Sequence, residues 1–387
     1  MEAYLLDWLN LLLRWAHVVV GIAWIGASFY FIWLDDHLEA SPDPRLAGEL
    51  WAIHGGGFYN ARKYKLAPAQ LPATLHWFKW EAYWTWITGF ALLVLMYYAN
   101  AELYLIDPAV MALSKPAAIG LGLGFLVLGL IVYEGLCRSP AGRNDLVLSG
   151  ILLLFLVLAA WGLTKVFSGR GAFIHYGAIL GTIMAANVAH VIIPGQRRMV
   201  QAMREGREPD AKDGLAGKQR SVHNTYFTLP VLFVMISNHH AGVFGHRWGW
   251  LALVALTLAG ALIRVWFVQR HKGPAPAWVW VLGLLFIVFT AVLLSPAKPE
   301  QAAKVEFSDV KRIVDVRCVA CHADKPSFQG MAEAPKGVKL DTPERIRAQA
   351  PQIHQQTVLG KAMPPGNLTG ITAEERALLD RWFRGGG

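Results

Sequence analysis

The residues with the most specific chemistry stand near the end of the chain, in the run Cys318-Val319-Ala320-Cys321-His322. A Cys-x-x-Cys-His pattern is the attachment signature of c-type haem, in which two thiols form thioethers and the adjacent imidazole ligates the iron. A bare Cys-x-x-Cys also occurs in redox dithiols and in zinc sites. A four-thiolate zinc site is excluded, because the chain has only 3 cysteines. The histidine favours haem c, and electron transfer is the first functional hypothesis.

The second axial ligand of the iron is expected from the same small domain. Met363 is the leading candidate, because the Pro-Pro-Gly that follows it predicts a rigid, non-helical loop. A thioether ligand would raise the reduction potential of the haem. Met331 and His354 are the alternatives.

Three helices are expected around this motif. Apolar residues spaced between Ser308 and Arg317 lead into the first cysteine, and Thr342-Pro343 begins a middle helix. Thr372-x-x-Glu375 is a capping box for a last helix that ends near Phe383. Residues 306–387 therefore resemble a short mono-haem cytochrome c domain.

The rest of the chain is too apolar for an ordinary soluble protein, with 55% hydrophobic residues, 16% charged residues and 16 tryptophans. Eight apolar runs are each near the ~20 residues that a membrane span requires, and the sixth is interrupted by Pro230: 8–34, 82–99, 117–137, 146–165, 172–193, 225–243, 249–269 and 277–295. The expected fold is all-α. A polytopic membrane helix bundle (1–295) is followed by a Pro-punctuated linker (296–305) and the cytochrome c domain (306–387).

The positive charges indicate how the bundle lies in the membrane. Loops after the odd-numbered runs hold 16 Lys and Arg residues, against four in the loops after runs two, four and six: Lys115, Lys165, Arg170 and Arg247. By the positive-inside rule the odd loops face the cytoplasm. Both termini, and with them the cytochrome c domain, are then expected on the periplasmic side of a bacterial inner membrane. The net charge of +9 is thereby explained by topology, without a nucleic-acid partner.

Histidines inside apolar runs are costly, which makes them candidates for function. His17 lies in the outer half of the first run, with Gly21 one turn away where a flat ligand can approach. Helical bundles hold haem b with histidines beside small residues. Four histidines of the outer half are therefore candidate ligands of an intramembrane haem b: His17, His175, His239 and His240.

A second group lies toward the cytoplasmic side and indicates a substrate pocket: His54, His76, His190, His223, Glu81 and Arg264. Three glycines after His54 permit close backbone approach to a ligand, and the surrounding aromatic residues can stack on a planar molecule. The Arg264 guanidinium needs an anionic partner. Roughly half of the histidines in the two groups are expected to be structural.

A weak internal repeat suggests two fused four-helix units. Tyr83-Trp84-Thr85 opens run two as Tyr226-Phe227-Thr228 opens run six, and His17 and His175 hold similar places in runs one and five. Internal repeats of this kind are common in membrane proteins.

Several longer motifs resemble those of the membrane-bound bacterial urate hydroxylases, which are urate oxidases with a C-terminal cytochrome c domain. They are Trp-Ala-His and Trp-Ile-Gly in run one, His-Gly-Gly-Gly-Phe-Tyr from position 54, His-Trp-Phe-Lys-Trp-Glu-Ala-Tyr from position 76, and the stretch 223–239. The first run also resembles the haem-binding first helix of the small membrane protoporphyrinogen oxidases, which supports His17 as a haem ligand.

The resemblance implies hydroxylation of urate to 5-hydroxyisourate, with electrons leaving through cytochrome c and no hydrogen peroxide formed. Implied partners are urate, the lipid bilayer, and a soluble or membrane cytochrome c or terminal oxidase as acceptor. Arg264 or Lys79 suits the urate anion, and Glu81 or a histidine is a candidate base that activates water.

Two other classes of protein are weighed against this one. A quinol-to-cytochrome c electron-transfer protein would not need the dense cytoplasmic loop, and a transporter with a haem sensor should have broken helices in both halves. Because a hydrocarbon core of ~30 Å separates an inner substrate site from an outer haem c, a relay centre inside the membrane is expected.

Overall fold

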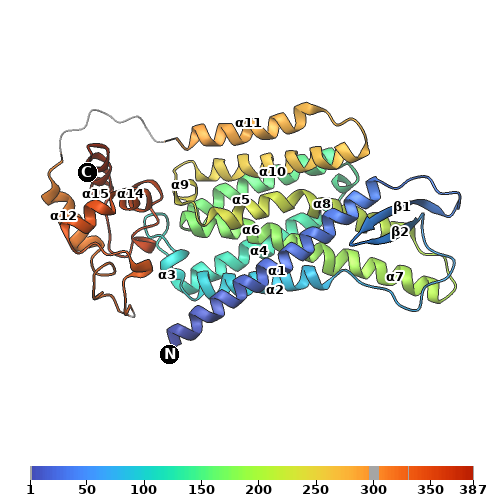
Figure 1. Cartoon of the computed structure of the whole chain (residues 1–387), viewed down its shortest axis with the longest axis horizontal. Coiled ribbons are helices and arrows are strands. Elements are labelled where there is room, and N and C mark those ends of the chain that lie inside the picture. Colours follow the sequence, from blue (N-terminus) through green and yellow to red (C-terminus); the bar gives the residue numbers. More distant parts are fainter. Residues whose placement is uncertain (1, 296–304, 330, 387) are drawn as a thin grey trace.

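The helices of the N-terminal part run roughly along the long axis of the molecule (Figure 1). The structure is a computed structural model that describes residues 2–295, 305–329 and 331–386. The N-terminus and the C-terminal domain lie at one end, and the strands and α7 lie at the other (Figure 1). The predicted linker, 296–305, lies almost entirely outside the described residues.

A helix occupies each of the eight predicted runs. The first half of the chain forms α1 (Glu2–Asp36), β1 (Leu46–His54), β2 (Gly57–Tyr64), α2 (Trp80–Leu93), the π-helical turn η1 (Val94–Tyr98), α3 (Ala101–Tyr104), α4 (Lys115–Arg138), η2 (Pro140–Arg143) and α5 (Asp145–Val166). The second half forms α6 (Gly169–Ala186), the π-helical turn η3 (Asn187–Ile192), α7 (Ile193–Arg204), α8 (Ala211–Ser237), α9 (Ala241–Phe244), α10 (Gly249–Lys272) and α11 (Ala277–Leu293).

Among the described residues, 5 helices are long and apolar enough to cross a membrane: α1 from Tyr4, α4, α5, the continuous helix Gly169–Arg204, and α10. α11 is also apolar but has 17 residues. Large apolar side chains point outward from these helices, as with Val292, which is 67% exposed. An outward apolar surface of this extent fits contact with lipid.

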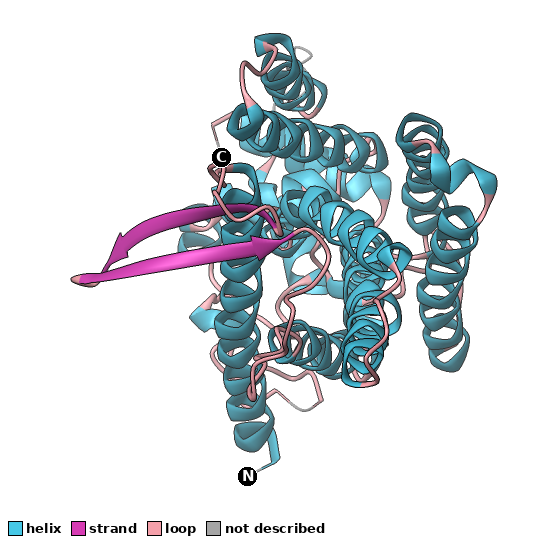
Figure 2. Ribbon diagram, turned by 90° about the vertical axis from the view of Figure 1, so that its right-hand side faces the viewer, coloured by secondary structure: helices cyan, strands magenta, loops and turns pink. Residues whose placement is uncertain are grey.

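The expectation of an all-α fold is wrong in one place. The loop after α1 forms an antiparallel hairpin in which Trp51 pairs with Asn60 and Ile53 pairs with Phe58. This hairpin projects sideways from the bundle (Figure 2). Gly55 and Gly56 have φ of +58° and +82°, so they form the tight turn rather than a ligand cradle. The Gly55-Gly56 pair between two segments that contain aromatic residues was the available signal.

Two features of the second half are not evident from the sequence. The charged stretch 195–224 forms α7 and the start of α8, and Arg220 within it is only 4% exposed. Pro230 was expected to interrupt run six, but α8 continues through it. Gly260 of α10 lies against Pro230, since a Cβ there would be 3.2 Å from the proline ring. The two-unit repeat stays a prediction.

The C-terminal domain has the three predicted helices. Its elements are α12 (Phe307–Arg317), η4 (Pro335–Gly337), α13 (Pro343–Ala348), α14 (Ala350–Ile353), the π-helical turn η5 (His354–Leu359), η6 (Pro365–Asn367) and α15 (Ala373–Arg384). Thr342 caps α13, and Thr372 and Glu375 make both bonds of the predicted capping box. The helices enclose a separate apolar core that includes Val310, Ile346 and Trp382.

α6 is the centre of the helical part, and glycines allow its neighbours to approach it. A Cβ on Gly129 of α4 would lie 2.5 Å from Cγ2 of Ile179 on α6. A Cβ on Gly177 of α6 would lie 2.6 Å from Cγ1 of Val234 on α8. The close helix spacing therefore depends on residues without side chains, as is usual in membrane bundles.

We expect Gly129→Ala to lower the thermal unfolding midpoint in detergent, because overpacking a tight core contact costs about 1–3 kcal/mol. Gly124→Ala is the matched control, since an added Cβ at this position of α4 meets nothing within 4 Å. The control should unfold no earlier than the wild type. Equal midpoints for the two variants would contradict close packing of α4 on α6.

Candidate functional site

The residues of the haem attachment motif lie on one turn after α12. The amide of Cys321 and the amide of His322 donate to the Cys318 carbonyl at 3.1 and 3.0 Å. Burial raises the pKa of the Cys318 thiol to about 12, so it stays protonated at neutral pH. The turn thus presents two thiols and an imidazole from successive positions.

The His322 ring is oriented for ligation. Its Nδ1 lies 2.8 Å from the Val338 carbonyl oxygen, which accepts a hydrogen bond when Nδ1 carries the proton. With the proton on Nδ1, Nε2 is the nitrogen with a free lone pair. A metal-ligating histidine commonly has this arrangement, in which a partner of the other nitrogen fixes the ring.

Met363 lies outside any helix, between η5 and η6, as the Pro-Pro-Gly sequence predicts. Its amide donates to the Gln356 carbonyl at 3.0 Å, and its carbonyl accepts from Arg376 Nη1 at 2.9 Å. Arg376 also interacts electrostatically with Cys318. One arginine therefore joins the candidate ligand loop to the attachment motif.

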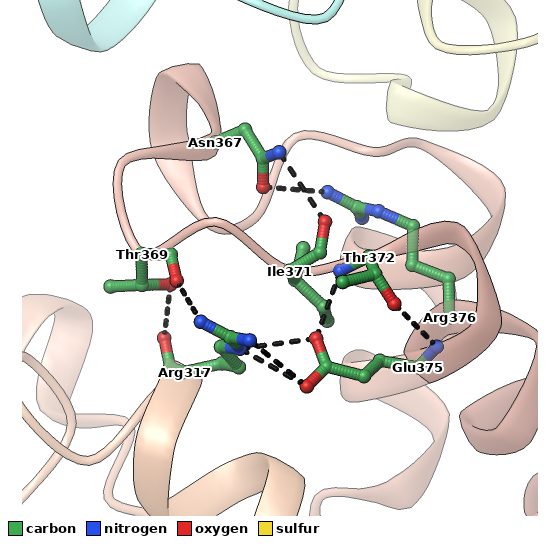
Figure 3. A network of polar contacts seen from close by, with 7 residues as sticks. All are labelled: Arg317, Asn367, Thr369, Ile371, Thr372, Glu375 and Arg376. Atoms are coloured by element: carbon green, nitrogen blue, oxygen red, sulfur yellow. Dashed lines mark hydrogen bonds and ion pairs between the residues drawn. The ribbon is translucent and has the colours of Figure 1, made fainter.

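A polar network fixes the same loop to the helix that precedes the motif (Figure 3). Arg317, directly before Cys318, pairs with Glu375 at 3.0 Å and donates to the Thr369 carbonyl. Burial opposes ionisation of Glu375, but the hydrogen bonds from Arg317 outweigh it and hold the pKa of the carboxyl below its usual range. Asn367 accepts from Arg376 and donates to the Ile371 carbonyl.

The alternative ligand His354 has another role. Its Nε2 lies 2.6 Å from Asp380, and its ring stacks on Phe383 with centroids 4.2 Å apart. It is buried, so both contacts hold it in the domain core.

The residues around His322 and Met363 fit a haem c, because porphyrin supplies four nitrogen ligands and the protein only the axial ones. Among the described residues, no group of three or more His, Cys, Asp and Glu side chains could hold a bare metal ion.

A buried polar network lies within the bundle, at the junction of α4, η3 and α8. We call it the inner polar network, and its members are Tyr133, Glu134, Asn187, Arg220, His223 and Asn224. Sequence reasoning identified only His223. Asn187 stands in a π-helical turn, a distortion that is frequent at functional sites.

Hydrogen bonds connect the members in series. The Tyr133 hydroxyl lies 2.7 Å from His223 Nδ1 and accepts from the Asn187 amide at 3.0 Å. The same amide group donates to Asn224 Oδ1 at 2.8 Å. Arg220 pairs with Glu134 at 2.9 Å and lies over the Tyr133 ring. The network is satisfied internally, and His223 keeps Nε2 for another partner.

Arg264 is different, because it is a buried cation without an anion. Its guanidinium carbon lies 3.6 Å from the centre of the Phe29 ring, and the residue is only 7% exposed. The Nε atom is buried and has no hydrogen-bond partner among the described residues. Tyr226, one turn after His223 on α8, is its electrostatic neighbour. A buried, unpaired guanidinium is costly and calls for an anionic ligand.

The other predicted inner residues do not join this site. His54 is exposed at the hairpin tip, and His190 is exposed on η3. His76 stacks edge-on against Phe78 and lines an apolar groove with α7. Glu81 is partly exposed in the first turn of α2, and Lys79 lines an open, basic groove of about 530 Å³ with three arginines of α7. Of the predicted inner residues, His223 belongs to the inner polar network, and Arg264 lies beside Tyr226, one turn further along α8.

The four outer histidines do not converge either. His17 Nδ1 lies 3.0 Å from Thr88 on α2, whereas both nitrogens of His175 have partners, the Gly171 carbonyl and the Tyr98 hydroxyl. Thr88 and Tyr98 stand ten residues apart on one helical run, or about 15 Å. His239 and His240 are exposed after α8. As placed, these residues do not fit a shared haem b.

Fold and site together define a mainly helical protein with membrane-type helices and a C-terminal domain that carries a Cys-x-x-Cys-His motif. The family model described as urate oxidase N-terminal matches residues 3–295, more than half of the chain. The chain therefore belongs to the urate oxidase N-terminal family, and its family relates it to oxidation of urate. Comparisons with curated proteins and with solved structures give no match.

We expect Met363→Leu to lower the reduction potential of the haem by on the order of 0.1 V, because axial ligands set this potential. The thioether-to-iron charge-transfer band should disappear from the absorption spectrum. Met331→Leu is the control and should leave both the band and the potential unchanged. If the band stays in the Met363 variant and disappears from the Met331 variant, the axial ligand is Met331 and not Met363.

Proposed function

We propose that this protein is a cytochrome c-coupled urate hydroxylase, which oxidises urate to 5-hydroxyisourate and passes the electrons through its C-terminal domain to the respiratory chain. The observation that carries the proposal is the family match over residues 3–295, joined in one chain to a Cys-x-x-Cys-His motif. The acceptor would be a soluble or membrane cytochrome c or a terminal oxidase.

The reaction balances without dioxygen. Urate and one water give 5-hydroxyisourate, two protons and two electrons. The protein must therefore bind an anion, activate water, and remove protons and electrons separately. No hydrogen peroxide forms, because the electrons leave through protein.

Arg264 supports the anion-binding part of this proposal. Urate is planar and anionic at neutral pH, and the guanidinium is buried and unpaired beside Phe29. A fork of N–H donors matches adjacent oxygen and nitrogen acceptors of a purine anion. Binding would also supply the counter-charge that Arg264 otherwise lacks.

His223 is the best-placed base. The Tyr133 hydroxyl positions its Nδ1, and Nε2 remains for a proton from the attacking water. Tyr226 stands one turn away and is the neighbour of Arg264, so base and anion site lie on adjoining parts of α8 and α10. Glu81 is the weaker candidate, because it lies at the start of α2 outside this cluster.

Cys318, Cys321 and His322, with Met363 as second ligand, would hold a haem c. Once attached, this haem supplies a one-electron acceptor of raised potential. Eight spans in a bacterial inner membrane, with the C-terminal domain in the periplasm, complete the proposal. The asymmetry of Lys and Arg between odd and even loops supports this orientation.

The test of the function is urate-dependent reduction of the protein's own haem under strictly anaerobic conditions. Purified protein should reduce its haem c on addition of urate, and product formed in ¹⁸O-water should carry the label. Xanthine, which lacks the oxygen at C8, is the control substrate. Reduction by a quinol with none by urate would replace the proposal with quinol-to-cytochrome c electron transfer.

Arg264→Gln should raise KM for urate roughly 10- to 150-fold, because a hydrogen bond to a charged group contributes about 1.5–3 kcal/mol. Arg264→Lys should recover part of the loss. Arg270→Gln is the control on the same helix, since Arg270 is exposed and lies over Trp266. Equal KM values in the Arg264 and Arg270 variants would exclude Arg264 from urate binding.

A further inference from the structure

The C-terminal domain contacts the helical bundle through the loop that carries Met363. On the bundle side the contact is made by α3 and α9, two short helices at the end where the N-terminus lies (Figure 1). On the domain side it is made by η5 and η6, which flank Met363. The candidate ligand loop therefore faces the bundle.

Glycines allow the two backbones to meet in this contact. A Cβ on Gly245, after α9, would lie 1.8 Å from the Gly360 carbonyl oxygen. A Cβ on Gly360 would lie 2.3 Å from the Ala241 side chain, and one on Gly366 would lie 2.1 Å from the Glu102 carbonyl oxygen. No side chain separates the two parts at these points.

Small and charged residues continue the contact. Ala362, directly before Met363, packs against the apolar core of the bundle. Arg376, which donates to the Met363 carbonyl, interacts electrostatically with Asp107 after α3. Arg376 thus holds the Met363 loop within the domain and also faces the bundle.

Aromatic side chains lie behind the contact within the bundle. The rings of Tyr97 and Tyr104 have centroids 6.2 Å apart, and Arg170 lies over the Tyr104 ring at 4.9 Å. The Tyr97 hydroxyl donates to Asn238 at 2.7 Å, close to the start of α9. A polar and aromatic layer therefore connects the bundle interior with the contact.

We propose that this contact, with Gly245 and Ala241 against Gly360 and Gly366 against Glu102, is where electrons pass from the helical part to the C-terminal domain. The inference rests on the proposed function. The two electrons that urate loses would cross one at a time, and the external cytochrome c or terminal oxidase would take up each electron from the domain before the next one crosses. Because the Met363 face is covered, the external acceptor uses another face of the domain.

Gly360→Ala and Gly245→Ala test the proposal. The φ angles of Gly360 and Gly245 are −91° and −87°, so alanine fits the local backbone at each position. Each substitution therefore disturbs only the contact. Gly242→Ala is the matched control on α9, because a Cβ there meets nothing within 4 Å. We expect urate-driven haem reduction to slow roughly tenfold or more in the first two variants and to stay at the wild-type rate in the control.

Three further readouts separate the outcomes. Amide hydrogen exchange in 241–245 and 356–366 should accelerate in Gly360→Ala and Gly245→Ala, which shows that the contact has opened. The haem absorption spectrum and reduction by dithionite should not change, which shows that the domain is intact. Faster exchange with an unchanged rate of urate-driven reduction would overturn the proposal.

Cross-linking supplies the complementary measurement. His246 follows Gly245 on the bundle side of the contact and Lys361 follows Gly360 on the domain side, and the two glycines meet directly. In a Cys137→Ala background, His246→Cys with Lys361→Cys joined by a short bismaleimide should keep the wild-type rate. Loss of reduction in the locked protein would show that the docked state is unproductive. Absence of urate-driven reduction in the wild type would reject the proposed function, while hydrogen exchange would still report the contact.

Discussion

Polar groups inside the helical part must find partners within the protein, because lipid offers none. This constraint separates the two kinds of buried cation in the structure. Arg220 has Glu134, Asn187 and the Tyr133 ring around it, and the charge is compensated where it stands. Arg264 has an aromatic face and a tyrosine neighbour but no anion. The first arginine stabilises the fold, whereas the second leaves a charge for a ligand to neutralise.

The same constraint explains where the helices deviate from α geometry. η3 is a π-helical turn within the continuous helix Gly169–Arg204, whereas η1 is the π-helical end of the helix that begins with α2, and each places polar side chains inward. η3 directs Asn187 to Tyr133 and Asn224, and η1 directs Tyr98 to His175. A π-helical turn inserts one residue and so rotates the following side chains toward the interior. The bundle uses these turns to satisfy groups that a regular helix would point elsewhere.

The sequence predicted helices well and side-chain partners poorly. Apolar runs and the Thr372 capping box depend on neighbours within one segment, so local patterns suffice. Arg220 stands in a charged stretch of sequence that gives no sign of its burial, because its partner, Glu134, lies on another helix. The hairpin was overlooked because its glycines were interpreted as a ligand site, although positive φ at Gly55 and Gly56 is what a tight turn requires.

The histidines show the limit of sorting residues by depth. Four of them were predicted to share the outer half of the bundle, but depth fixes only one coordinate, and direction around each helix decides whether rings meet. His175 turns toward Tyr98 and His17 toward Thr88, which are ten residues apart on the same helical run. In the proposed function, electrons released near Arg264 would have to reach the opposite end of the bundle. Because the histidines lie apart, the groups along that path are tyrosines. Tyr98 contacts His175 of α6, and Tyr97 lies beside Tyr104 of α3.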